Sequence, residues 1–332
     1  MNLLITGGAG FIGANLIERV IDRPEVARLV NLDCLTYAAN PDNLSAVTTH
    51  PKYSFEKVDL RDRAAVERVV RDHTITHVMH LAAESHVDRS IAAPGAFVET
   101  NVLGTFHLLE ACREIWQGKG DGNRFLHVST DEVYGSLGAT GAFTEQSAYA
   151  PSSPYSATKA AADMLVRAYH RTYGMPVVIS NCANNFGPYQ HREKLVPVII
   201  ASVLARHSIP LFGDGQQVRD WLFVRDHADA LWLALSCGRL GETYNIGAHN
   251  EWPNLKLAEL ICDCVDEFLP ELGGSSRQLI SHVSDRPGHD RRYAIDASKI
   301  RDELGWKPHH DFKGALRETV RWYLNHRERL GE

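Results

Sequence analysis

The sequence predicts an α/β protein: a doubly wound parallel sheet joined to a smaller, interleaved C-terminal α/β domain. The first observation is that short apolar runs alternate with helix-length stretches through the first half of the chain. Such alternation is typical of a parallel sheet with helices on both faces. The second is a glycine-rich turn that directly follows the first apolar run. The third is the length of 332 residues, which favours two domains over one core.

The expected strands of the first half are apolar runs that end in polar or small residues. Two intervening segments, Ala64–Asp72 and Phe97–Trp116, have the length and pattern of helices. In doubly wound sheets, ligands bind beyond the carboxyl ends of the strands. The runs are Leu3–Thr6, Leu29–Asp33, Ser54–Asp59, His77–Ala82, Phe125–Ser129 and Val177–Cys182, and the residues expected at the ligand-binding edge are Gly10, Asp33, Asp59, Ala82 and Thr130.

After residue 183 the regular alternation breaks down. Asn184 to Pro188 has the composition of a loop, and Thr243–Ile246 is expected to return to the large sheet as its last strand. We therefore expect one domain from residues 1–183 with 222–250, and a second from residues 184–221 and 251–332. In the second we expect short strands at Ile209–Phe212 and Val218–Val224 around a turn at Gly213–Gly215, and helices at Leu255–Leu269 and Phe312–Leu324.

Charge and composition exclude several classes of protein. The net charge of -6 argues against non-specific nucleic-acid binding, which requires a basic surface. No apolar run reaches the roughly 18 residues of a membrane span, and Met1 leads into the glycine turn without the pattern of a signal peptide. The six cysteines form no Cys-x-x-Cys pair, so we expect reduced thiols in a cytoplasmic protein. The 17 histidines show no metal-binding spacing, so we expect no metal site.

The glycine turn, Gly7-Gly-Ala-Gly-Phe-Ile-Gly13, follows the first strand and opens a helix. Glycines in such a turn let backbone amides approach a pyrophosphate at the helix N-terminus. The spacing, Gly-x-x-Gly-x-x-Gly, differs slightly from Gly-x-Gly-x-x-Gly, and a glycine-rich turn alone is also common in ordinary loops. The strand before it and the helix after it favour a Rossmann-type dinucleotide site.

Asp33 ends the second strand, about 20 residues after Gly13, where an acid binds the ribose hydroxyls of NAD. A carboxylate there repels the 2′-phosphate of NADP, and no arginine follows it, so the sequence favours NAD. The alternative is an acid that caps the turn at the strand end. Asp59 ends the third strand and is equally compatible with a contact to the adenine and with a structural role.

Tyr155 and Lys159 are four residues apart in an expected helix, so their side chains lie on one face, one turn apart. Tyrosine has a pKa near 10, and lowering that pKa by about 3 requires about 4 kcal/mol of differential stabilisation. A nearby ammonium group and a positive nicotinamide have the required sign. The pattern often arises by chance, from a packed tyrosine and a solvated lysine. Its place after a dinucleotide turn favours a phenol base that helps to oxidise an alcohol.

Thr130, Asp131 and Glu132 directly follow the fifth strand, at the ligand-binding edge of the sheet. Adjacent acids after Ser-Thr are also common in turns and helix caps. At this edge, two carboxyl groups in different environments can divide the roles of acid and base. Beside a phenol base and a nicotinamide, they could remove water from a newly formed ketone.

Taken together, these motifs resemble those of the dTDP-glucose 4,6-dehydratases, a group of extended short-chain dehydrogenase/reductases (the NAD-dependent epimerase/dehydratase family). The resemblance runs nearly end to end. The glycine turn and Tyr-x-x-x-Lys belong to the whole superfamily, whereas the Thr-Asp-Glu run is much more specific to the dehydratases. The matching segments are Gly7–Gly13, Asp33–Tyr37, Leu81–Ser90, Ser129–Gly135, Pro151–Lys159, Asn181–Asn185, Gly213–Gln217, Arg219–Trp221 and Asp285–Tyr293.

The resemblance implies that the chain converts dTDP-glucose into dTDP-4-keto-6-deoxyglucose, an intermediate for deoxysugars such as rhamnose, with internally recycled NAD. Tyr155 takes the O4 proton as hydride leaves C4, Thr130 hydrogen-bonds O4, and Lys159 holds the ribose and lowers the pKa of the tyrosine. Glu132 then removes the C5 proton, and Asp131 protonates the departing C6 hydroxyl. Hydride returns to C6 and C5 is reprotonated.

The resemblance also implies two sets of binding residues. Within the substrate set, Arg219 is best suited to clamp the pyrophosphate, although a salt bridge to Asp220 or Asp226 is its alternative role. The cofactor set is Gly7, Gly10, Phe11, Ile12, Gly13, Asp33, Leu35, Thr36, Asp59, Leu60, Leu81, Ala82, Ala83, Thr100, Tyr155, Lys159 and Asn185. The substrate set is Ser85, Thr130, Asn184, Lys194, Leu195, Pro210, Phe212, Arg219, Asn254, Arg286 and His289.

Several alternatives stay open. The chain departs from the family pattern at Cys34, and also at Ala183, Phe186 and residues 190–192. The departures at 183, 186 and 190–192 leave the choice between thymine and uracil undecided, so a UDP-sugar 4,6-dehydratase is one alternative. A sugar-nucleotide 4-epimerase or a decarboxylase would keep Tyr155 but have no use for the acid pair. A non-catalytic NAD or nucleotide sensor belongs to a different class. The family resemblance also implies a homodimer, formed through the helices that begin near Phe97 and Tyr155.

Overall fold

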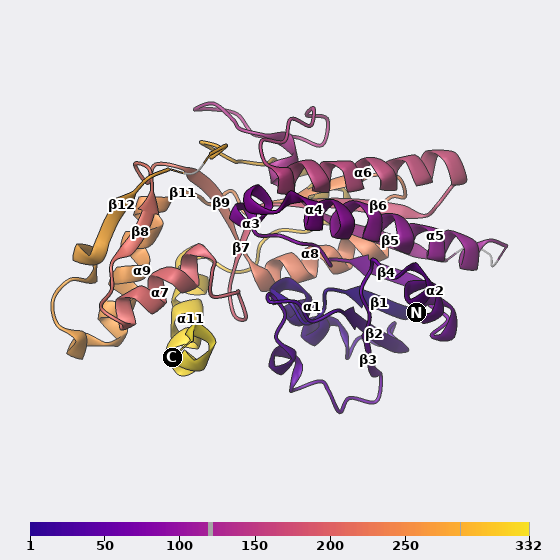
Figure 1. The fold of residues 1–332 in the computed structure, drawn as a ribbon, viewed down its shortest axis with the longest axis horizontal. Coiled ribbons are helices and arrows are strands. Elements are labelled where there is room, and N and C mark those ends of the chain that lie inside the picture. The colour runs from indigo at the N-terminus through magenta and orange to yellow at the C-terminus, as the bar shows by residue number, and fades with distance from the viewer. Residues whose placement is uncertain (119–121, 286, 332) are drawn as a thin grey trace.

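In the computed structural model, which describes residues 1–118, 122–285 and 287–331, a parallel seven-stranded sheet forms the centre of the molecule. The strand order is β10-β6-β5-β4-β1-β2-β3, so the chain starts in mid-sheet, runs to one edge and then returns (Figure 1). The switch point lies between β1 and β4, where doubly wound folds bind their ligands. The strands are β1 (Asn2–Thr6), β2 (Arg28–Asp33), β3 (Tyr53–Lys57), β4 (His77–His80), β5 (Arg124–Thr130), β6 (Val177–Cys182) and β10 (Thr243–Ile246).

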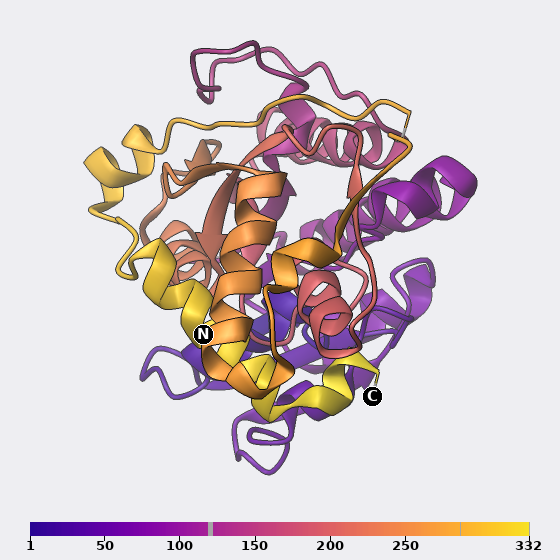
Figure 2. The same cartoon turned by 90° about the vertical axis from the view of Figure 1, so that its left-hand side faces the viewer.

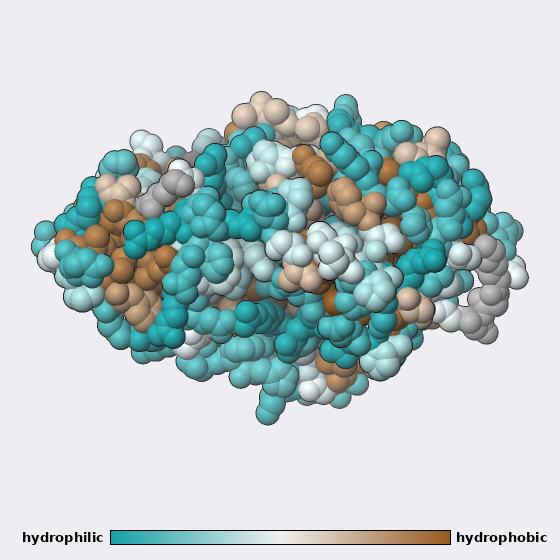
Figure 3. Space-filling model, turned by 90° about the horizontal axis from the view of Figure 1, so that it is seen from below, coloured by the Kyte–Doolittle hydropathy of each residue, from teal (hydrophilic) through white to brown (hydrophobic). Residues whose placement is uncertain are grey.

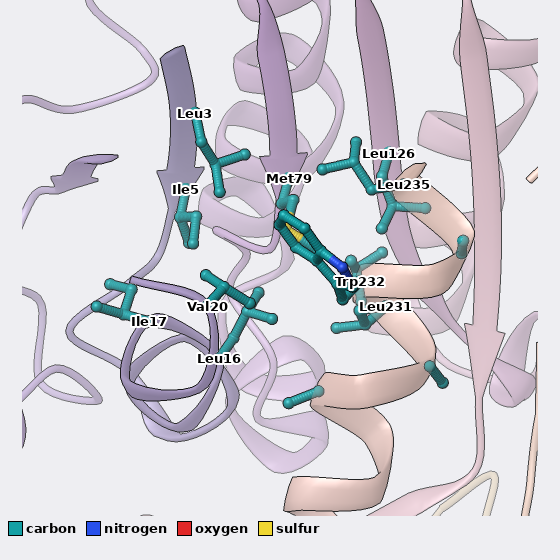
Figure 4. Packing of buried hydrophobic residues seen from close by; sticks show 14 of the residues in the cluster. Leu3, Ile5, Leu16, Ile17, Val20, Met79, Leu126, Leu231, Trp232 and Leu235 are labelled. Atoms are coloured by element: carbon teal, nitrogen blue, oxygen red, sulfur yellow. The ribbon is translucent and has the colours of Figure 1, made fainter. Parts of the chain in front are cut away.

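Helices cover both faces of this sheet because successive residues of its buried strands point to opposite sides. Leu3 and Ile5 of β1 belong to one buried cluster, whereas Leu4 belongs to the cluster on the other face. Figure 4 shows the first cluster, in which side chains of β1 and α1 meet Trp232 of α8. The first face is covered by α1 (Phe11–Val20), α8 (Val224–Cys237) and α10 (Ser298–Leu304), and the second by α2 (Arg63–Asp72), α5 (Thr105–Trp116) and α6 (Pro154–Tyr173).

The predicted fold class is confirmed, and so is the late strand. Thr243–Ile246 forms β10, which pairs in parallel with β6 at the edge of the large sheet. The helix that precedes it, α8, was not predicted, although its buried residues pack directly against the sheet. Two expected strands end earlier than predicted, at Lys57 and His80. Beyond His80, the amides of Leu81 and Ala82 bond to the Thr6 hydroxyl at 3.2 and 3.1 Å, which ends the ladder.

The predicted helix at Phe97–Trp116 is interrupted. The chain instead forms α3 (Val87–Ala92), α4 (Pro94–Phe97), a π-helix η2 (Val98–Gly104) and then α5. Asn101 accounts for the irregular segment, because its side chain accepts from the Glu84 amide (2.8 Å) and donates to Thr158 (3.0 Å). Widened helical turns of this kind occur frequently at functional sites. The bonds of Asn101 tie η2 to α6 and to the chain that follows β4.

The C-terminal part of the chain builds a second cluster of buried side chains around small sheets. Strands β11 (Glu251–Pro253), β9 (Val218–Phe223) and β7 (Asn184–Phe186) form one sheet, and β12 (Ile280–Val283) pairs with β8 (Ile209–Phe212) in another. Figure 2 shows α9 in orange and α11 in yellow at the near end of the molecule. The helices that pack with these sheets are α7 (Leu195–Leu204), α9 (Asn254–Phe268) and α11 (Phe312–Asn325).

The helices in the described part of the chain include no candidate membrane span. None of the helices there combines the length and the apolar character that a bilayer requires. Seen from below, the molecule is mainly hydrophilic, and apolar residues gather at the end where α9 and β12 lie (Figure 3). In the same described ranges, His, Cys, Asp and Glu side chains form no group that could hold a metal ion.

Candidate active site

A cavity of about 360 Å³ opens at the carboxyl ends of the sheet strands. It runs from the glycine turn after β1, past the ends of β2, β3 and β4, to the ends of β5 and β6. Both the Tyr155–Lys159 pair and the glycine turn line it, although these motifs lie about half the chain apart in sequence. The fold therefore places an elongated pocket where the strand order predicts one.

The backbone around the glycine turn packs so closely that a side chain on Gly7 or Gly13 would clash with it. Gly7 has a positive φ of 73°, and a Cβ at that position would lie 2.8 Å from backbone atoms of Ala82. A Cβ on Gly13 would lie 2.2 Å from the carbonyl oxygen of Gly7. Helix α1 starts after Gly10 without a side-chain cap. The amides of its first turn therefore face the pocket, which is the arrangement that binds pyrophosphate.

Asp33 and Asp59 differ in how they are held. The carboxylate of Asp33 accepts from the amides of Ala9 (3.0 Å) and Leu35 (2.8 Å), and burial raises its pKa. Asp59 instead forms a two-pronged ion pair with Arg61, and these hydrogen bonds lower the pKa of Asp59. Asp33 thus joins the glycine turn to the end of β2. Arg61 is the partner that a structural role of Asp59 requires. Both acids nevertheless line the pocket.

Most of the predicted cofactor residues line this cavity. Leu35 is the exception: its side chain packs against the hydrophobic core, its φ is 59°, and its amide holds Asp33. The lining includes Gly7, Gly10, Phe11, Ile12, Gly13, Asp33, Thr36, Asp59, Leu60, Leu81, Ala82, Ala83, Thr100, Tyr155, Lys159 and Asn185.

Helix α6 presents Tyr155 and Lys159 to the pocket. Ser153 and Ser156 form a capping box at its start, with Pro154 in the first turn, so the helix begins just before Tyr155. Lys159 is almost fully buried, and its ammonium group donates to the carbonyl oxygen of Val128 at 2.8 Å. Burial lowers the pKa of Lys159, and the charge of Asp163 opposes this shift.

The surroundings of Tyr155 raise its pKa well above the ordinary value. Burial is the largest cause, the charge of Glu132 adds to it, and a hydrogen bond with Thr130 opposes it. We expected Lys159 to lower this pKa, but its ammonium group is bonded to Val128 rather than to the phenol. A phenolate at this position therefore requires further positive charge in the pocket, of the kind that an oxidised nicotinamide carries.

The two acids after β5 occupy different environments. Thr130 caps the short helix η3 (Asp131–Tyr134) by accepting from the Glu132 amide. Asp131 is 1% exposed, and its Oδ2 atom is buried without a hydrogen-bond partner. Burial raises the pKa of Asp131 well above its usual range, with a further contribution from the charge of Glu132. Glu132 is less buried and lines the pocket. Asp131 is thus the acid whose protonated form is favoured, and Glu132 is the more accessible group.

Arg219 lies close to this acid pair. Its guanidinium group donates to the carbonyl oxygens of Val218 (2.8 Å) and Asp290 (2.9 Å) and stacks 4.2 Å from the centre of the Tyr293 ring. Its charge partly offsets the rise in the pKa of Asp131. The side chain of Asp220 accepts from three backbone amides, at residues 248–250, and Asp226 accepts from the amides of residues 309 and 310.

The other predicted substrate residues fall into two groups. Ser85, Asn184 and Lys194 line the cavity together with Thr130, and the Lys194 ammonium group donates to the Ser85 carbonyl oxygen. The second group lies in the C-terminal part, where His289 bonds Asp285 (2.6 Å) and stacks edge-on with Phe212. Arg286 lies outside the described residues. Leu195 begins α7, Pro210 and Phe212 lie on β8, and Asn254 begins α9 with a buried, unpaired Oδ1 atom.

Several pocket residues were given no binding role from the sequence, although Cys34 and residues 190–192 were noted as departures from the family pattern. Cys34 follows Asp33 directly, and Cys182 ends β6, so their positions at strand ends were the available signal. Gln190 and His191 also line the cavity, but they come from a loop beyond the large sheet. Only the tertiary structure brings that loop to the pocket. Tyr293 was noted as part of a matching segment but was given no role, and it is buried beside Arg219.

Comparisons with known proteins agree with this geometry. The family model described as GDP-mannose 4,6 dehydratase matches residues 4–319. A dTDP-glucose 4,6-dehydratase of Xanthomonas campestris pv. campestris is 53% identical over 326 residues, which cover 97% of this chain and 92% of the relative. The crystal structure of DesIV, a dTDP-glucose 4,6-dehydratase from Streptomyces venezuelae with NAD bound, superposes with a TM-score of 0.92 at 43% identity, covering 99% of this chain and 98% of that one.

A UDP-glucose 4-epimerase from Thermotoga maritima shares the fold, with a TM-score of 0.87, but is only 27% identical, covering 98% of this chain and 99% of that one. This chain is therefore much more similar in sequence to the two dehydratases than to this epimerase. The chain belongs to the dTDP-glucose 4,6-dehydratases, within the extended short-chain dehydrogenase/reductase family.

Proposed function

We propose that this chain is an NAD-dependent hydro-lyase that converts dTDP-glucose into dTDP-4-keto-6-deoxyglucose. The observation that carries the proposal is the acid pair Asp131–Glu132, held beside the phenol of Tyr155 at the carboxyl edge of the sheet. Two acids in unlike environments suit an elimination, in which one group gives a proton and the other takes one. Two relatives at 53% identity carry the same activity in their names.

The residues that would hold NAD fit that cofactor. Gly7 and Gly13 leave space that a Cβ would fill, and the uncapped start of α1 offers amides to a pyrophosphate. Asp33 is positioned to accept from ribose hydroxyls and would repel a 2′-phosphate. NAD, when bound, takes up one hydride and returns it within the same cycle.

Tyr155 and its neighbours serve the oxidation at C4. Tyr155 accepts the O4 proton, and the Thr130 hydroxyl, which lines the same pocket, hydrogen-bonds O4. Lys159 supplies positive charge beside the nicotinamide ribose from its anchor on Val128. Because burial raises the pKa of Tyr155, the base becomes effective when the positive cofactor is in place. This ordering keeps the phenol neutral until the cofactor is bound.

The acid pair serves the elimination of water. Once C4 is a ketone, the proton on C5 is acidic, and the accessible Glu132 removes it. Burial favours the protonated form of Asp131, which gives that proton to the C6 hydroxyl as water departs. Hydride then returns to C6, and a proton returns to C5. A general acid must start protonated and a general base ionised, and the two environments favour that division.

The two parts of the chain divide the ligands. Residues 1–183 with 222–250 supply most of the NAD site, together with Asn185. Residues 184–221 and 251–332 supply most of the site for the nucleotide end of the substrate, together with Ser85. Arg219 supports this division, because a guanidinium group fixed by two carbonyl oxygens is ready to bind a pyrophosphate. Ser85, Asn184, Lys194, Leu195, Pro210, Phe212, Asn254 and His289 complete the proposed substrate site.

The alternative functions have less support. A sugar-nucleotide 4-epimerase needs Tyr155 and Lys159 but neither Asp131 nor Glu132. A non-catalytic sensor needs none of these groups in a reactive arrangement. A UDP-sugar 4,6-dehydratase would use the same machinery, and only a measurement of nucleotide preference separates it. The cytoplasm is the proposed location, supported by free thiols at all six cysteines.

We also propose a homodimer built on α6 and the segments beside it. Large apolar side chains are exposed on this side of the molecule, and the elements that carry them contact one another. Exposed apolar side chains gathered on neighbouring helices are typical of interaction sites. They are Ile91 on α3, Val98 and Leu103 on η2, and Met164 and Tyr173 on α6.

The proposed reaction predicts loss of water from dTDP-glucose without net consumption of cofactor. Purified protein should carry NAD(H), and product identified by mass and NMR should be the 4-keto-6-deoxy sugar nucleotide. UDP-glucose in a parallel reaction measures nucleotide preference. Stoichiometric use of added NADH, release of NADP on denaturation, or a 4-epimer as the product would contradict the proposal.

Replacements in the acid pair should separate elimination from oxidation. Asp131→Asn and Glu132→Gln should each slow elimination by about 10²-fold or more, because each removes one proton transfer. Oxidation at C4, followed as enzyme-bound NADH in a single turnover, should change less, whereas Tyr155→Phe should slow that step.

A substrate with fluoride at C6 provides the matched control for the acid pair. Fluoride leaves without protonation, so this substrate should partly restore Asp131→Asn but not Glu132→Gln. Exchange of the C5 proton with deuterated solvent should largely vanish in Glu132→Gln. Equal restoration of both variants, or full dehydration by either, would overturn the assignment of roles.

The dimer predicts that Met164→Asp weakens self-association at least about tenfold, because a charge would be buried at the interface. Sedimentation velocity should then give the mass of one chain at concentrations where the native protein gives two. Leu240→Asp is the control, since Leu240 is similarly exposed but lies outside α3, η2 and α6. A native protein that sediments as a monomer, or equal effects of both variants, would refute this interface.

A further inference from the structure

A buried acid that the proposed chemistry does not use lies one turn after Lys159 on α6. Asp163 is 0% exposed, and its Oδ2 atom accepts hydrogen bonds from Ser129 (2.9 Å) and Tyr149 (2.8 Å). Its Oδ1 atom lies 3.1 Å from Nε2 of His127, which is also fully buried. A carboxylate removed from water is costly unless an opposite charge or several hydrogen bonds compensate it.

The packing of α6 on β5 brings Asp163 and Lys159 to the same short stretch of strand. His127 and Ser129 point to the same side of β5, because alternate residues of a strand share a face. Both contact Asp163, and the carbonyl oxygen of Val128 between them accepts from Lys159 at 2.8 Å. Two successive turns of α6 therefore dock on three consecutive residues of β5.

Two cations lie near this contact, Lys159 and Arg167, whereas the histidines beside it are neutral. Burial lowers the pKa of His127, and the charge of Lys159 lowers it further, so this ring is neutral near pH 7. His80 on β4, which stacks 5.3 Å from His127, has its pKa lowered by burial as well. Arg167, one turn beyond Asp163, donates to the Tyr149 hydroxyl, and Cys182 on β6 is a buried thiol whose pKa burial raises.

We propose that Asp163 is a positioning residue whose buried carboxylate keeps Lys159 protonated and anchored on Val128, and so maintains the positive charge next to Tyr155. The proposal rests on the proposed function, because it assigns Lys159 its role in ionising Tyr155. The hydrogen bonds that Asp163 accepts come from Ser129 and Tyr149, and not from the glycine turn or the acid pair. It acts through Lys159.

Asp163→Asn tests this role, because asparagine can still accept from Ser129 and Tyr149 while the charge is lost. The readout is the pH dependence of single-turnover NADH formation by the holoenzyme with dTDP-glucose. Loss of the carboxylate should let Lys159 lose its proton, so the pKa of Tyr155 and the acidic limb of the profile should rise by about 1 pH unit or more. Below that limb, the rate should fall about tenfold.

The direction of the shift distinguishes this proposal from a direct field effect. If Lys159 stayed protonated, removing a nearby negative charge would lower the pKa of Tyr155 and move the limb to lower pH. Tyr149→Phe is the matched control, because it removes one hydrogen bond from Asp163 but leaves the carboxylate charge. The acidic limb of its pH profile should stay at the native pH. In a Lys159→Met background, Asp163→Asn should not raise the limb. A limb that stays in place or falls in Asp163→Asn would overturn the proposal.

Stability provides a second readout that does not depend on turnover. Lys159→Met leaves Asp163 as a buried acid without its counter-charge, so the double variant Lys159→Met/Asp163→Asn should melt at a higher temperature than Lys159→Met. Additive losses in the double variant would contradict the coupling. This holds even if Asp163→Asn alone fails to fold. A native protein that makes no NADH from dTDP-glucose refutes the proposed function instead. The melting temperatures of the variants then still test the coupling between Lys159 and Asp163.

Discussion

The site depends on one buried hydrogen bond, from the ammonium group of Lys159 to the carbonyl oxygen of Val128. This bond fixes the rotation of α6 against β5, and therefore the direction in which Tyr155, one turn earlier, enters the pocket. The same strand continues into Thr130, so phenol and threonine meet at the strand end. A lysine in this place must remain charged despite its burial, which makes the polar groups behind it part of the chemistry.

Burial also separates the roles of the two adjacent acids. Asp131 lies beneath the pocket surface with an unpaired oxygen, whereas Glu132 lines the cavity. Unpaired buried polar atoms are rare in folded proteins, and here others occur on Asn184, Gln190 and Asn254, near the proposed ligands. These atoms cost stability in the folded chain, and the three amide oxygens are acceptors for donor groups of a polar substrate. The fold thus maintains a polar site that hydrophobic packing alone would not favour.

The sequence predicts the large sheet well because the patterns that mark each strand lie within that strand or directly next to it. Apolar runs, the glycine turn and polar strand ends mark β1, β2, β5 and β6 within a few residues, and strand order then brings distant motifs to one edge. The irregular η2 segment escaped prediction because the partners of Asn101 lie far along the chain, at Glu84 and Thr158. The direction of the Leu35 side chain could not be predicted for a similar reason, since packing against the hydrophobic core decides it.

The electrostatic details could not be predicted from the sequence. The spacing of Tyr155 and Lys159 suggested that a nearby ammonium group lowers the pKa of the tyrosine. The ammonium group of Lys159 instead bonds the carbonyl oxygen of Val128, and burial raises that pKa. Likewise, His127 and Asp163 are 36 positions apart and carry no motif, although they lie 3.1 Å from each other behind the site. Charges act through distances, and those distances exist only after folding.

The central claim is that one pocket oxidises, dehydrates and reduces a single sugar with a cofactor that never leaves. A crossover experiment tests it most directly. Substrate deuterated at C4 is mixed with substrate that carries carbon-13 throughout the sugar but no deuterium, and the products are analysed by mass and NMR. The account predicts deuterium at C6 of the unlabelled-carbon product alone. Deuterium in the carbon-13 product, or its loss to solvent, would contradict it.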